Sequence, residues 1–169
     1  MNTSISIRAL AGLALSAMIF AACGGAAAPA PTAVPATAKP AAAAAAVVLE
    51  LGTKGDELAF DKTTLSAPAG SKITIRFNNK AGAGSGMLHN VVVLKAGASI
   101  DGVAADGIAA GEANGYVKPN DTRVLAHSKL IKGGENLDLT FDAPAPGDYI
   151  VTCTFPGHYV LMKLTLTIK

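Results

Sequence analysis

Apolar and polar residues alternate with a period of two along three segments of the chain, residues 72–77, 136–141 and 163–169. This alternation is typical of strands that bury one face. Residues 90–94 form instead a continuous apolar run, as expected of a strand that is covered on both faces. Further short segments rich in strand-forming residues bring the predicted strands to seven: 47–51, 122–127 and 148–153.

Turn-forming residues separate these segments. Pro-Ala-Gly at 68–70, Lys-Gly-Gly at 132–134 and Pro-Ala-Pro-Gly at 144–147 all interrupt the strand pattern. Seven or eight short strands at this spacing favour an all-β fold, a Greek-key β-sandwich of about eight strands. Residues 98–115 are rich in Gly and Ala and break the alternation, and we expect a short helix there, packed outside the sandwich.

The first 22 residues differ from the rest of the chain. One charge, Arg8, precedes an apolar run over residues 9–22, which is shorter than the ~20 residues of a membrane span. A basic start, an apolar run and small residues before Cys23 predict a secretory signal peptide at 1–22. Residues 20–24 also resemble a bacterial lipobox, in which cleavage precedes the Cys and a lipid is attached to its sulfur, so we expect lipidation at Cys23. An ordinary signal cleaved elsewhere and an uncleaved anchor are the alternatives, and all three place the rest of the chain outside the cytoplasm.

Ala and Pro dominate residues 24–46, in which Lys39 carries the one charge. Four prolines fix φ and remove hydrogen-bond donors, which disfavours a regular helix. The segment therefore predicts a semi-extended tether, and with Cys23 it forms a region, 23–46, that would hold a soluble domain at a distance from a membrane. Residues 47–169 remain as the globular domain.

The composition excludes several classes of protein. Three His cannot supply several metal centres, and two Cys can build neither a disulfide-rich scaffold nor a Cys₄ zinc site. The formal net charge of +2 is too small to indicate a nucleic-acid binder. Only Arg8 and Lys39 of the 14 basic residues precede residue 47, so the domain is neutral, with 12 basic and 12 acidic residues. The Gly-rich run at 81–86 precedes a predicted strand rather than a helix, so it does not fit a phosphate loop, and no other motif indicates an enzyme.

The candidate chemistry lies near the C-terminus, in Cys153-Thr-Phe-Pro-Gly-His158-Tyr-Val-Leu-Met162. A thiol, an imidazole and a thioether thus fall in one loop between two predicted strands. A second imidazole is best sought in His89, which precedes the apolar strand at 90–94. Two His, one Cys and a weak axial Met form the ligand set of blue copper sites. An isolated Cys is more often a buried structural thiol, but this spacing favours a ligand role for Cys153.

Residues 87–90, Met-Leu-His-Asn, together with the loop from Cys153 to Met162 resemble the azurin branch of the cupredoxins. The similarity extends through residues 116–119, 123–131 and 161–166, and it covers most of residues 47–169. The spacing between Cys and His distinguishes azurin-type loops from the shorter plastocyanin-type loops. The resemblance implies one copper ion (Cu⁺/Cu²⁺), bound by His89 and His158 through Nδ1, by Cys153 through Sγ and by Met162 through a long axial Sδ.

The resemblance also implies roles for residues around the ligands. The carbonyl of Leu88 occupies the position of a weak axial ligand; azurins have Gly there, so this contact is expected to be longer or lost. Asn90 matches a residue that joins the two ligand loops, and the backbone N–H groups of Asn90 and Phe155 match donors to the sulfur. His127 matches a surface histidine and is not expected to bind copper. Azurins also carry a disulfide near the N-terminus, for which the domain has no Cys.

Several apolar residues flank the predicted ligands and could simply belong to the core. We expect them instead to form an exposed patch around His158 at which partners dock. The predicted docking patch consists of Met87, Leu88, Phe155, Pro156 and Val160.

Together these features predict a monomeric, membrane-tethered type 1 blue copper protein that carries single electrons at the periplasmic face of the cell membrane. By resemblance, its partners would dock transiently: a c-type cytochrome, a quinol-oxidising complex and the reaction centre of a photosynthetic chain. An extracytoplasmic copper carrier or chaperone with the same ligands is the alternative, and it would be expected to release the metal readily from a more open site.

Overall fold

Eight strands and one α-helix follow one another in residues 45–169, the part of the chain that this computed structural model describes. The predicted signal peptide, Cys23 and nearly all of the predicted tether lie outside the described residues. The elements are β1 (Ala46–Gly52), β2 (Thr64–Ala67), β3 (Lys72–Asn78), β4 (Val92–Leu94), α1 (Ile100–Ala110), the 3₁₀ turn η1 (Glu112–Asn114), β5 (Val124–His127), β6 (Asn136–Asp142), β7 (Gly147–Thr152), the 3₁₀ turn η2 (His158–Val160) and β8 (Lys163–Ile168).

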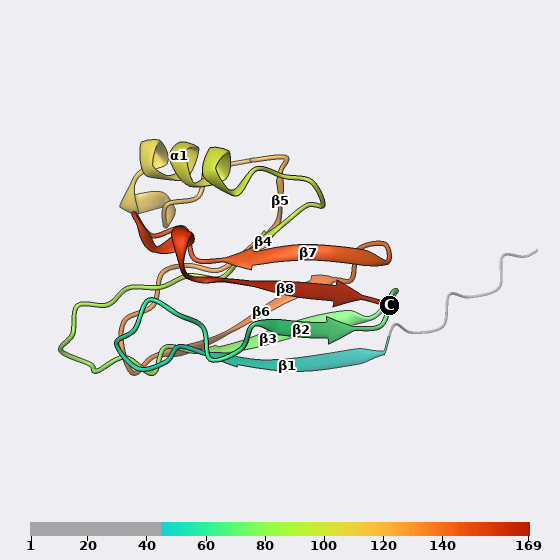
Figure 1. Cartoon of the computed structure of the whole chain (residues 1–169), viewed down its shortest axis with the longest axis horizontal. Helices are drawn as coiled ribbons and strands as arrows, with labels where there is room; N and C mark the ends of the chain where they lie inside the picture. The colour runs from blue at the N-terminus through green and yellow to red at the C-terminus, as the bar shows by residue number, and fades with distance from the viewer. Residues whose placement is uncertain (1–44) are drawn as a thin grey trace, which may run out of the picture. The chain divides into compact units, whose positions relative to one another are not determined.

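The strands form two sheets (Figure 1). One sheet has the order β1-β3-β6 and the other the order β2-β8-β7-β4-β5. β1 pairs in parallel with β3, and β2 in parallel with β8, while the other neighbours are antiparallel. Four of the six neighbouring pairs are not consecutive in sequence, which reflects Greek-key connections. The predicted all-β sandwich of about eight strands is confirmed.

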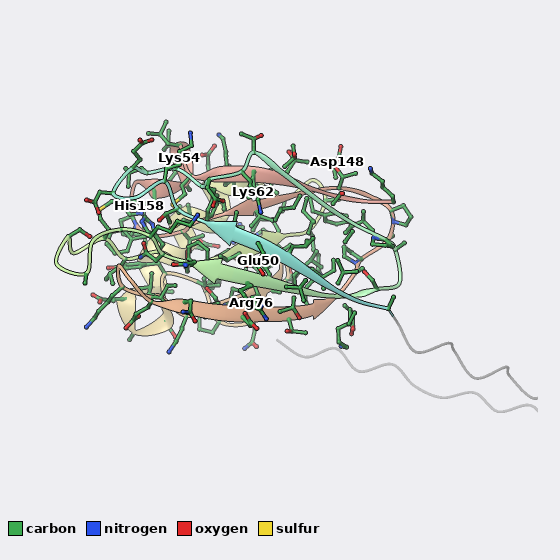
Figure 2. The ribbon with its side chains drawn as sticks, turned by 90° about the horizontal axis from the view of Figure 1, so that it is seen from below. Glu50, Lys54, Lys62, Arg76, Asp148 and His158 are labelled. Carbon is green, nitrogen blue, oxygen red and sulfur yellow. The ribbon has the colours of Figure 1, made fainter. Side chains whose placement is uncertain are left out.

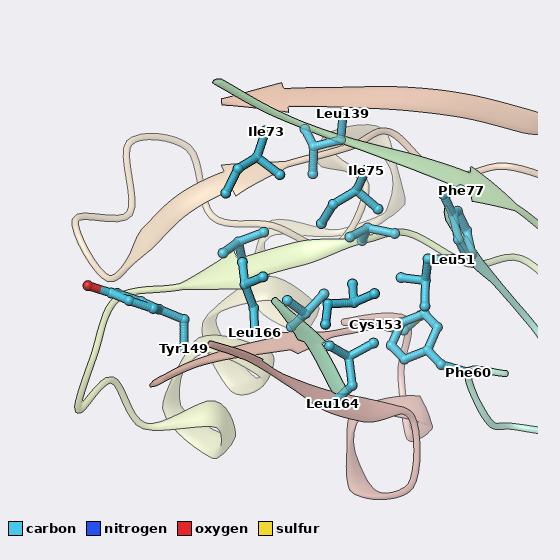
Figure 3. Packing of buried hydrophobic residues seen from close by; sticks show 14 of the residues in the cluster. Leu51, Phe60, Ile73, Ile75, Phe77, Leu139, Tyr149, Cys153, Leu164 and Leu166 are labelled. Atoms are coloured by element: carbon cyan, nitrogen blue, oxygen red, sulfur yellow. The ribbon is translucent and has the colours of Figure 1, made fainter. Parts of the chain in front are cut away.

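The core lies between the sheets, and the alternation along β3 shows how the sequence builds it. Ile73, Ile75 and Phe77 are fully buried and point toward the other sheet (Figure 3). The residues between them face solvent, and Arg76 pairs across the strands with Asp138, Nε to Oδ1 at 3.1 Å. Removing the apolar face of such a strand from water is the main stabilising contribution to a sandwich.

Strand β4 is buried on both faces, as its continuous apolar run predicts. Val93 belongs to the core between the sheets, whereas Val92 and Leu94 form a second cluster with Val103 of α1. The helix therefore packs on the outer face of the five-stranded sheet, which confirms a short helix outside the sandwich. Ser99 caps the start of α1, its hydroxyl accepting the backbone N–H of Gly102 at 3.1 Å. Within residues 45–169, no helix is both long enough and apolar enough to cross a membrane.

Three differences from the predicted strands have local causes. Strand β2 went unpredicted because its four residues, paired with β8, are too few to establish a pattern. The run at 90–94 yields only β4, because the N–H of Val91 bonds to the Ser128 hydroxyl at 2.9 Å instead of to a neighbouring strand. The segment at 122–127 starts later because the Asp121 carboxylate accepts the N–H of Arg123 at 2.9 Å, which makes a turn.

Candidate metal centre

Three predicted ligands meet at one end of the sandwich, the end at which Figure 2 shows His158. His89 precedes β4, Cys153 follows β7, and His158 opens η2. Cys153 Sγ lies 3.7 Å from Nδ1 of His89 and 3.7 Å from Nδ1 of His158, and the two Nδ1 atoms are 3.2 Å apart. Their ligand atoms form a candidate metal-binding group within the described residues.

The spacing of these three atoms fits a metal ion. The point equidistant from the corners of a triangle with sides of 3.2, 3.7 and 3.7 Å lies about 2.1 Å from each corner, close to the ~2.0–2.3 Å of metal–nitrogen and metal–sulfur bonds. One thiolate and two imidazoles in a plane around that point are the equatorial donors of a blue copper site. The donor set therefore suits copper in both size and chemistry.

Burial keeps the three ligands neutral as long as no cation lies between them. It raises the pKa of the Cys153 thiol to about 11, although the backbone N–H groups of Asn90 and Phe155 oppose this by hydrogen bonding to the sulfur. Burial, followed by the charge of His158, lowers the pKa of His89 to about 4, and burial also lowers the pKa of His158. Both imidazoles thus keep a free lone pair at neutral pH, and a bound cation replaces only the proton of the thiol.

His89 is held by backbone pairing rather than through its side chain. Its N–H bonds to the Ile131 carbonyl at 3.1 Å, and its carbonyl accepts the N–H of Ile131 at 2.9 Å. Asn79 Nδ2 supports both segments, donating to the carbonyls of Met87 at 3.0 Å and Ile131 at 3.1 Å. The outer ring nitrogen, His89 Nε2, is buried without a hydrogen-bond partner among the described groups. Metal-binding histidines usually donate that N–H to an acceptor, so this site departs from the common pattern.

Asn90 joins the two segments that carry the ligands. Its Oδ1 accepts the N–H of Thr154 at 2.8 Å, and its Nδ2 donates to Thr154 Oγ1 at 2.8 Å. Nδ2 also donates to the carbonyl of Gly115 at 2.8 Å. One side chain thus connects the residue after His89 with the residue after Cys153.

The ends of the ligand loop are closed by backbone bonds. The N–H of Cys153 donates to the carbonyl of Met162 at 3.1 Å, and the N–H of Met162 donates to the carbonyl of His158 at 2.8 Å. Met162 is fully buried in the same cluster as Cys153, so its thioether is held away from water. Axial coordination by Met162 and by the Leu88 carbonyl both stay predictions.

The residues of the predicted docking patch are more exposed than the ligands, of which His158 is the most exposed. His158 is 8% exposed, whereas His89, Cys153 and Met162 are all 0% exposed. Four of the five patch residues are half-buried, and the fifth, Val160, is 55% exposed: Met87, Leu88, Phe155, Pro156 and Val160. Next to Val160, Leu161 is 67% exposed, although it was not among the residues predicted for the patch. Its position between Val160 and the buried Met162 was the available signal, because neighbours of a buried residue tend to face outward.

His127 lies outside the ligand group, as expected. It is exposed at the end of β5, where it pairs with Val92. A surface groove of about 680 Å³ beside it is lined by residues that include Gly115 and Lys129 but none of the candidate ligands.

Comparison with known proteins places this geometry in a family. Residues 47–169 match the family described as copper binding proteins, plastocyanin/azurin family. The sequence is 37% identical to auracyanin-A of Chloroflexus aurantiacus over 170 residues, which cover 100% of both chains. It is 36% identical to azurin of Pseudomonas aeruginosa over 118 residues, covering 68% of this chain and 80% of azurin.

A solved structure agrees with these sequence matches. Auracyanin A, a "blue" copper protein from Chloroflexus aurantiacus, superposes with a TM-score of 0.69 at 42% sequence identity, covering 73% of this chain and 99% of that chain. The resemblance to azurin-like cupredoxins is therefore confirmed. The chain belongs to the plastocyanin/azurin family of copper-binding proteins, the blue copper electron carriers.

Proposed function

We propose that this protein carries single electrons on one copper ion held by His89, Cys153 and His158, with Met162 as a weak axial ligand. The convergence of Cys153 Sγ and the two Nδ1 atoms, at 3.7, 3.7 and 3.2 Å, is the observation that carries the proposal. Copper in such a site supplies the Cu⁺/Cu²⁺ couple. The carbonyl of Leu88 is a further candidate for a weak axial contact.

The contacts around the ligands favour an electron carrier over a copper carrier. Asn90 fastens the two ligand segments together, and backbone bonds close the loop at Cys153 and Met162. The ligand geometry of a site held in this way changes little between oxidation states, which lowers the reorganisation energy of electron transfer. A copper carrier or chaperone needs ligands that partners can reach, yet the four proposed ligands are between 0% and 8% exposed.

Electrons would pass at the predicted docking patch. Of the proposed ligands, His158 comes nearest the surface, and Phe155 packs against its ring with centroids 4.6 Å apart. Apolar residues with few charges around a slightly exposed ligand suit weak, transient docking. A c-type cytochrome, a quinol-oxidising complex and a photosynthetic reaction centre are the partners that we propose, and we expect the carrier to be a monomer.

The N-terminal sequence supports a location at the periplasmic face of the cell membrane. A signal-like segment at 1–22, a lipobox-like Cys23 and the Ala/Pro-rich residues up to 46 precede the domain. Strand β1 begins at the end of the sandwich opposite His158 (Figures 1 and 2). Attachment through the N-terminus would therefore leave the predicted docking patch free.

Copper titration of the purified domain tests the proposed site. Wild-type protein should bind one Cu²⁺ per chain and show the intense visible absorption of a copper–thiolate bond, and ascorbate should bleach it reversibly. The Cys153→Ser variant should fold without developing the band, whereas a matched surface change, Ser85→Ala, should retain it. A colourless wild-type protein, or a coloured Cys153→Ser variant, would contradict the assignment.

Two further measurements test the alternatives. Copper transfer to a strong chelator should be slow if the protein is an electron carrier, and rapid release would favour the copper carrier. Mass spectrometry of the mature N-terminus from native membranes should show a lipid on Cys23. An unmodified N-terminus would favour an ordinary secreted protein, and an intact leader would favour an uncleaved anchor.

A further inference from the structure

The segment between α1 and β5 contains an unusual backbone conformation beside the metal centre. Tyr116 has a φ of 54°, and with Asn120 (φ 58°) it makes up the non-glycine residues with positive φ in residues 45–169. Bulky side chains rarely adopt this left-handed conformation because it is sterically strained. Such strain persists only where surrounding contacts impose it, and it is often found at functional sites.

Helix α1 and the turn after it impose this conformation. The N–H of Tyr116 bonds to the carbonyl of Gly111 at 3.1 Å, and Gly115 is also left-handed, with a φ of 62°. A Cβ atom on Gly107 of α1 would lie 2.1 Å from the Tyr116 carbonyl oxygen. Because Gly107 has no side chain, the helix can pack in close contact with the backbone of Tyr116.

The two left-handed residues, Gly115 and the strained Tyr116, contact both halves of the metal centre. The Gly115 carbonyl accepts Nδ2 of Asn90 at 2.8 Å, next to His89. The ring of Tyr116 meets the ring of Phe155 edge to face, with centroids 5.2 Å apart and an interplanar angle of 77°. Phe155 in turn packs on the ring of His158, with centroids 4.6 Å apart, and its N–H bonds to the Cys153 sulfur.

We propose that Tyr116 is a positioning residue for the metal centre: its ring holds Phe155, and through Phe155 the ligands His158 and Cys153. It acts as a support from outside the ligand loop. The left-handed backbone conformation of Tyr116 allows two contacts at once: its ring meets Phe155, and the Gly115 carbonyl accepts the Asn90 side chain. This inference rests on the proposed metal site and adds to it a residue from the segment between η1 and β5.

The first test uses metal-free protein, and therefore does not depend on copper binding. Cys153 is fully buried, so an aromatic disulfide reagent can reach its thiol only when the ligand loop opens. Tyr116→Leu keeps the strained backbone conformation but removes the ring. It should accelerate the thiol reaction at least about tenfold. This increase should exceed the increase expected from the change in the equilibrium constant for unfolding of the whole domain. Tyr116→Phe keeps the ring and its edge-to-face contact with Phe155, so it should react within about twofold of wild type.

Asn120→Gly is the matched control, because it relieves the other positive φ without removing a ring near Phe155. It should leave the thiol reaction unchanged. The proposal is overturned if Tyr116→Leu accelerates the reaction only as much as it destabilises the whole domain. It is also overturned if Tyr116→Phe reacts as fast as Tyr116→Leu.

The second test uses copper-loaded protein. Tyr116→Leu should shift the visible absorption and speed copper loss to a chelator, whereas Tyr116→Phe and Asn120→Gly should match wild type. An unchanged spectrum and unchanged copper loss in Tyr116→Leu would count against the proposal. If wild-type protein fails to bind copper, the proposed function fails, but the thiol reaction still decides whether Tyr116 positions the loop.

Discussion

The two histidines of the candidate site reach the same point from opposite kinds of structure. His89 sits at a backbone bridge to Ile131, is fully buried, and has no hydrogen-bond partner for its outer nitrogen among the described groups. His158 sits in a 3₁₀ turn, is slightly exposed, and packs against Phe155. The His89 side is thus held by an isolated backbone bridge next to β4, while the His158 side is a loop closed over the site.

This contrast indicates that the two sides of the site have different roles. Backbone pairing between His89 and Ile131 holds the His89 side without a metal, because these bonds join two backbone segments directly. The loop from Cys153 to Met162 contributes the other proposed ligands and also the surface at which a partner can dock. Asn90 is the link between the sides, since it bonds to Thr154 and to Gly115.

Removing each imidazole in turn should have the largest effect and should separate the two sides of the site. His89→Gly and His158→Gly should both lose the visible absorption of the copper protein. Added imidazole should restore it in His158→Gly, because His158 reaches the surface, but not in His89→Gly, whose cavity is sealed. Visible spectra recorded during imidazole titration measure the difference. Equal rescue of the two variants would contradict the division into a sealed and an open side.

Removing the Asn90 side chain, which links the two sides, should lower the free energy of unfolding. Asn90→Ala leaves the buried N–H of Thr154 and the carbonyl of Gly115 unpaired, so we expect a loss of about 2–6 kcal/mol, at ~1–3 kcal/mol for each unpaired group. Urea unfolding of the metal-free protein measures this. Asn114→Ala is the control, because Asn114 Nδ2 makes one exposed bond, to the Ala110 carbonyl at 2.7 Å, and its loss should cost under ~1 kcal/mol. Similar losses in both variants would remove the special role of Asn90.

His89, on the sealed side of the site, should also determine how the stability of metal-free protein depends on pH. Burial lowers the pKa of His89 from 6.5 to about 4, so the unfolded chain takes up this proton first as the pH falls. Because the unfolded state then binds more protons, stability should decline between about pH 6.5 and pH 4. His89→Gln should flatten this part of the profile in denaturant titrations. A profile that His89→Gln leaves unchanged would show that another group is responsible.

A separate ion pair should act at lower pH. Hydrogen bonding to Arg123 lowers the pKa of Asp121 from 3.8 to about 2. The stability that this pair contributes is present above about pH 4 and is lost as the pH falls toward 2. His89→Gln should retain this second loss, which serves as its internal control.

Changing the proposed axial ligand should have a smaller effect. Met162→Leu should retain copper and its colour, because the equatorial donors are untouched, and it should raise the reduction potential, because an apolar axial position disfavours Cu²⁺. Cyclic voltammetry measures the shift. A lower potential, or loss of the metal, would contradict the assignment of Met162.

The smallest effect should come from the surface of the loop. Leu161→Ser should slow electron exchange with a c-type cytochrome by a few-fold without changing the potential or the stability, because Leu161 is 67% exposed beside the predicted docking patch. Val48→Ser is the matched control, since Val48 is 51% exposed but lies in β1. Stopped-flow mixing compares the two. Equal rates for both variants and wild type would place docking elsewhere.

How much the sequence could predict depended on whether a signal was local. Alternation along residues 72–77 predicted both a strand and its buried face, because burial of one face imposes that pattern directly. The loop from Cys153 to Met162 displays its ligand types side by side. His89 could be chosen only through the adjacent apolar run and the family resemblance, since its partners come from distant segments.

Other features leave no local trace. Strand β2 depends on pairing with β8, and four residues cannot show a period. The support given by Gly115 and Tyr116 depends on a backbone conformation and on the fit of α1 against it, which residue types alone do not reveal. That residues 45–169 offer Nε2 of His89 no hydrogen-bond partner is likewise a property of the assembled core.

The most direct test of the central claim is a crystal structure of the copper-loaded protein, with anomalous scattering recorded at the copper edge. We expect one strong copper peak per chain, within bonding distance of Cys153 Sγ and of Nδ1 of both His89 and His158. A copper peak at other residues, or a peak bound by only one of the two imidazoles, would contradict it.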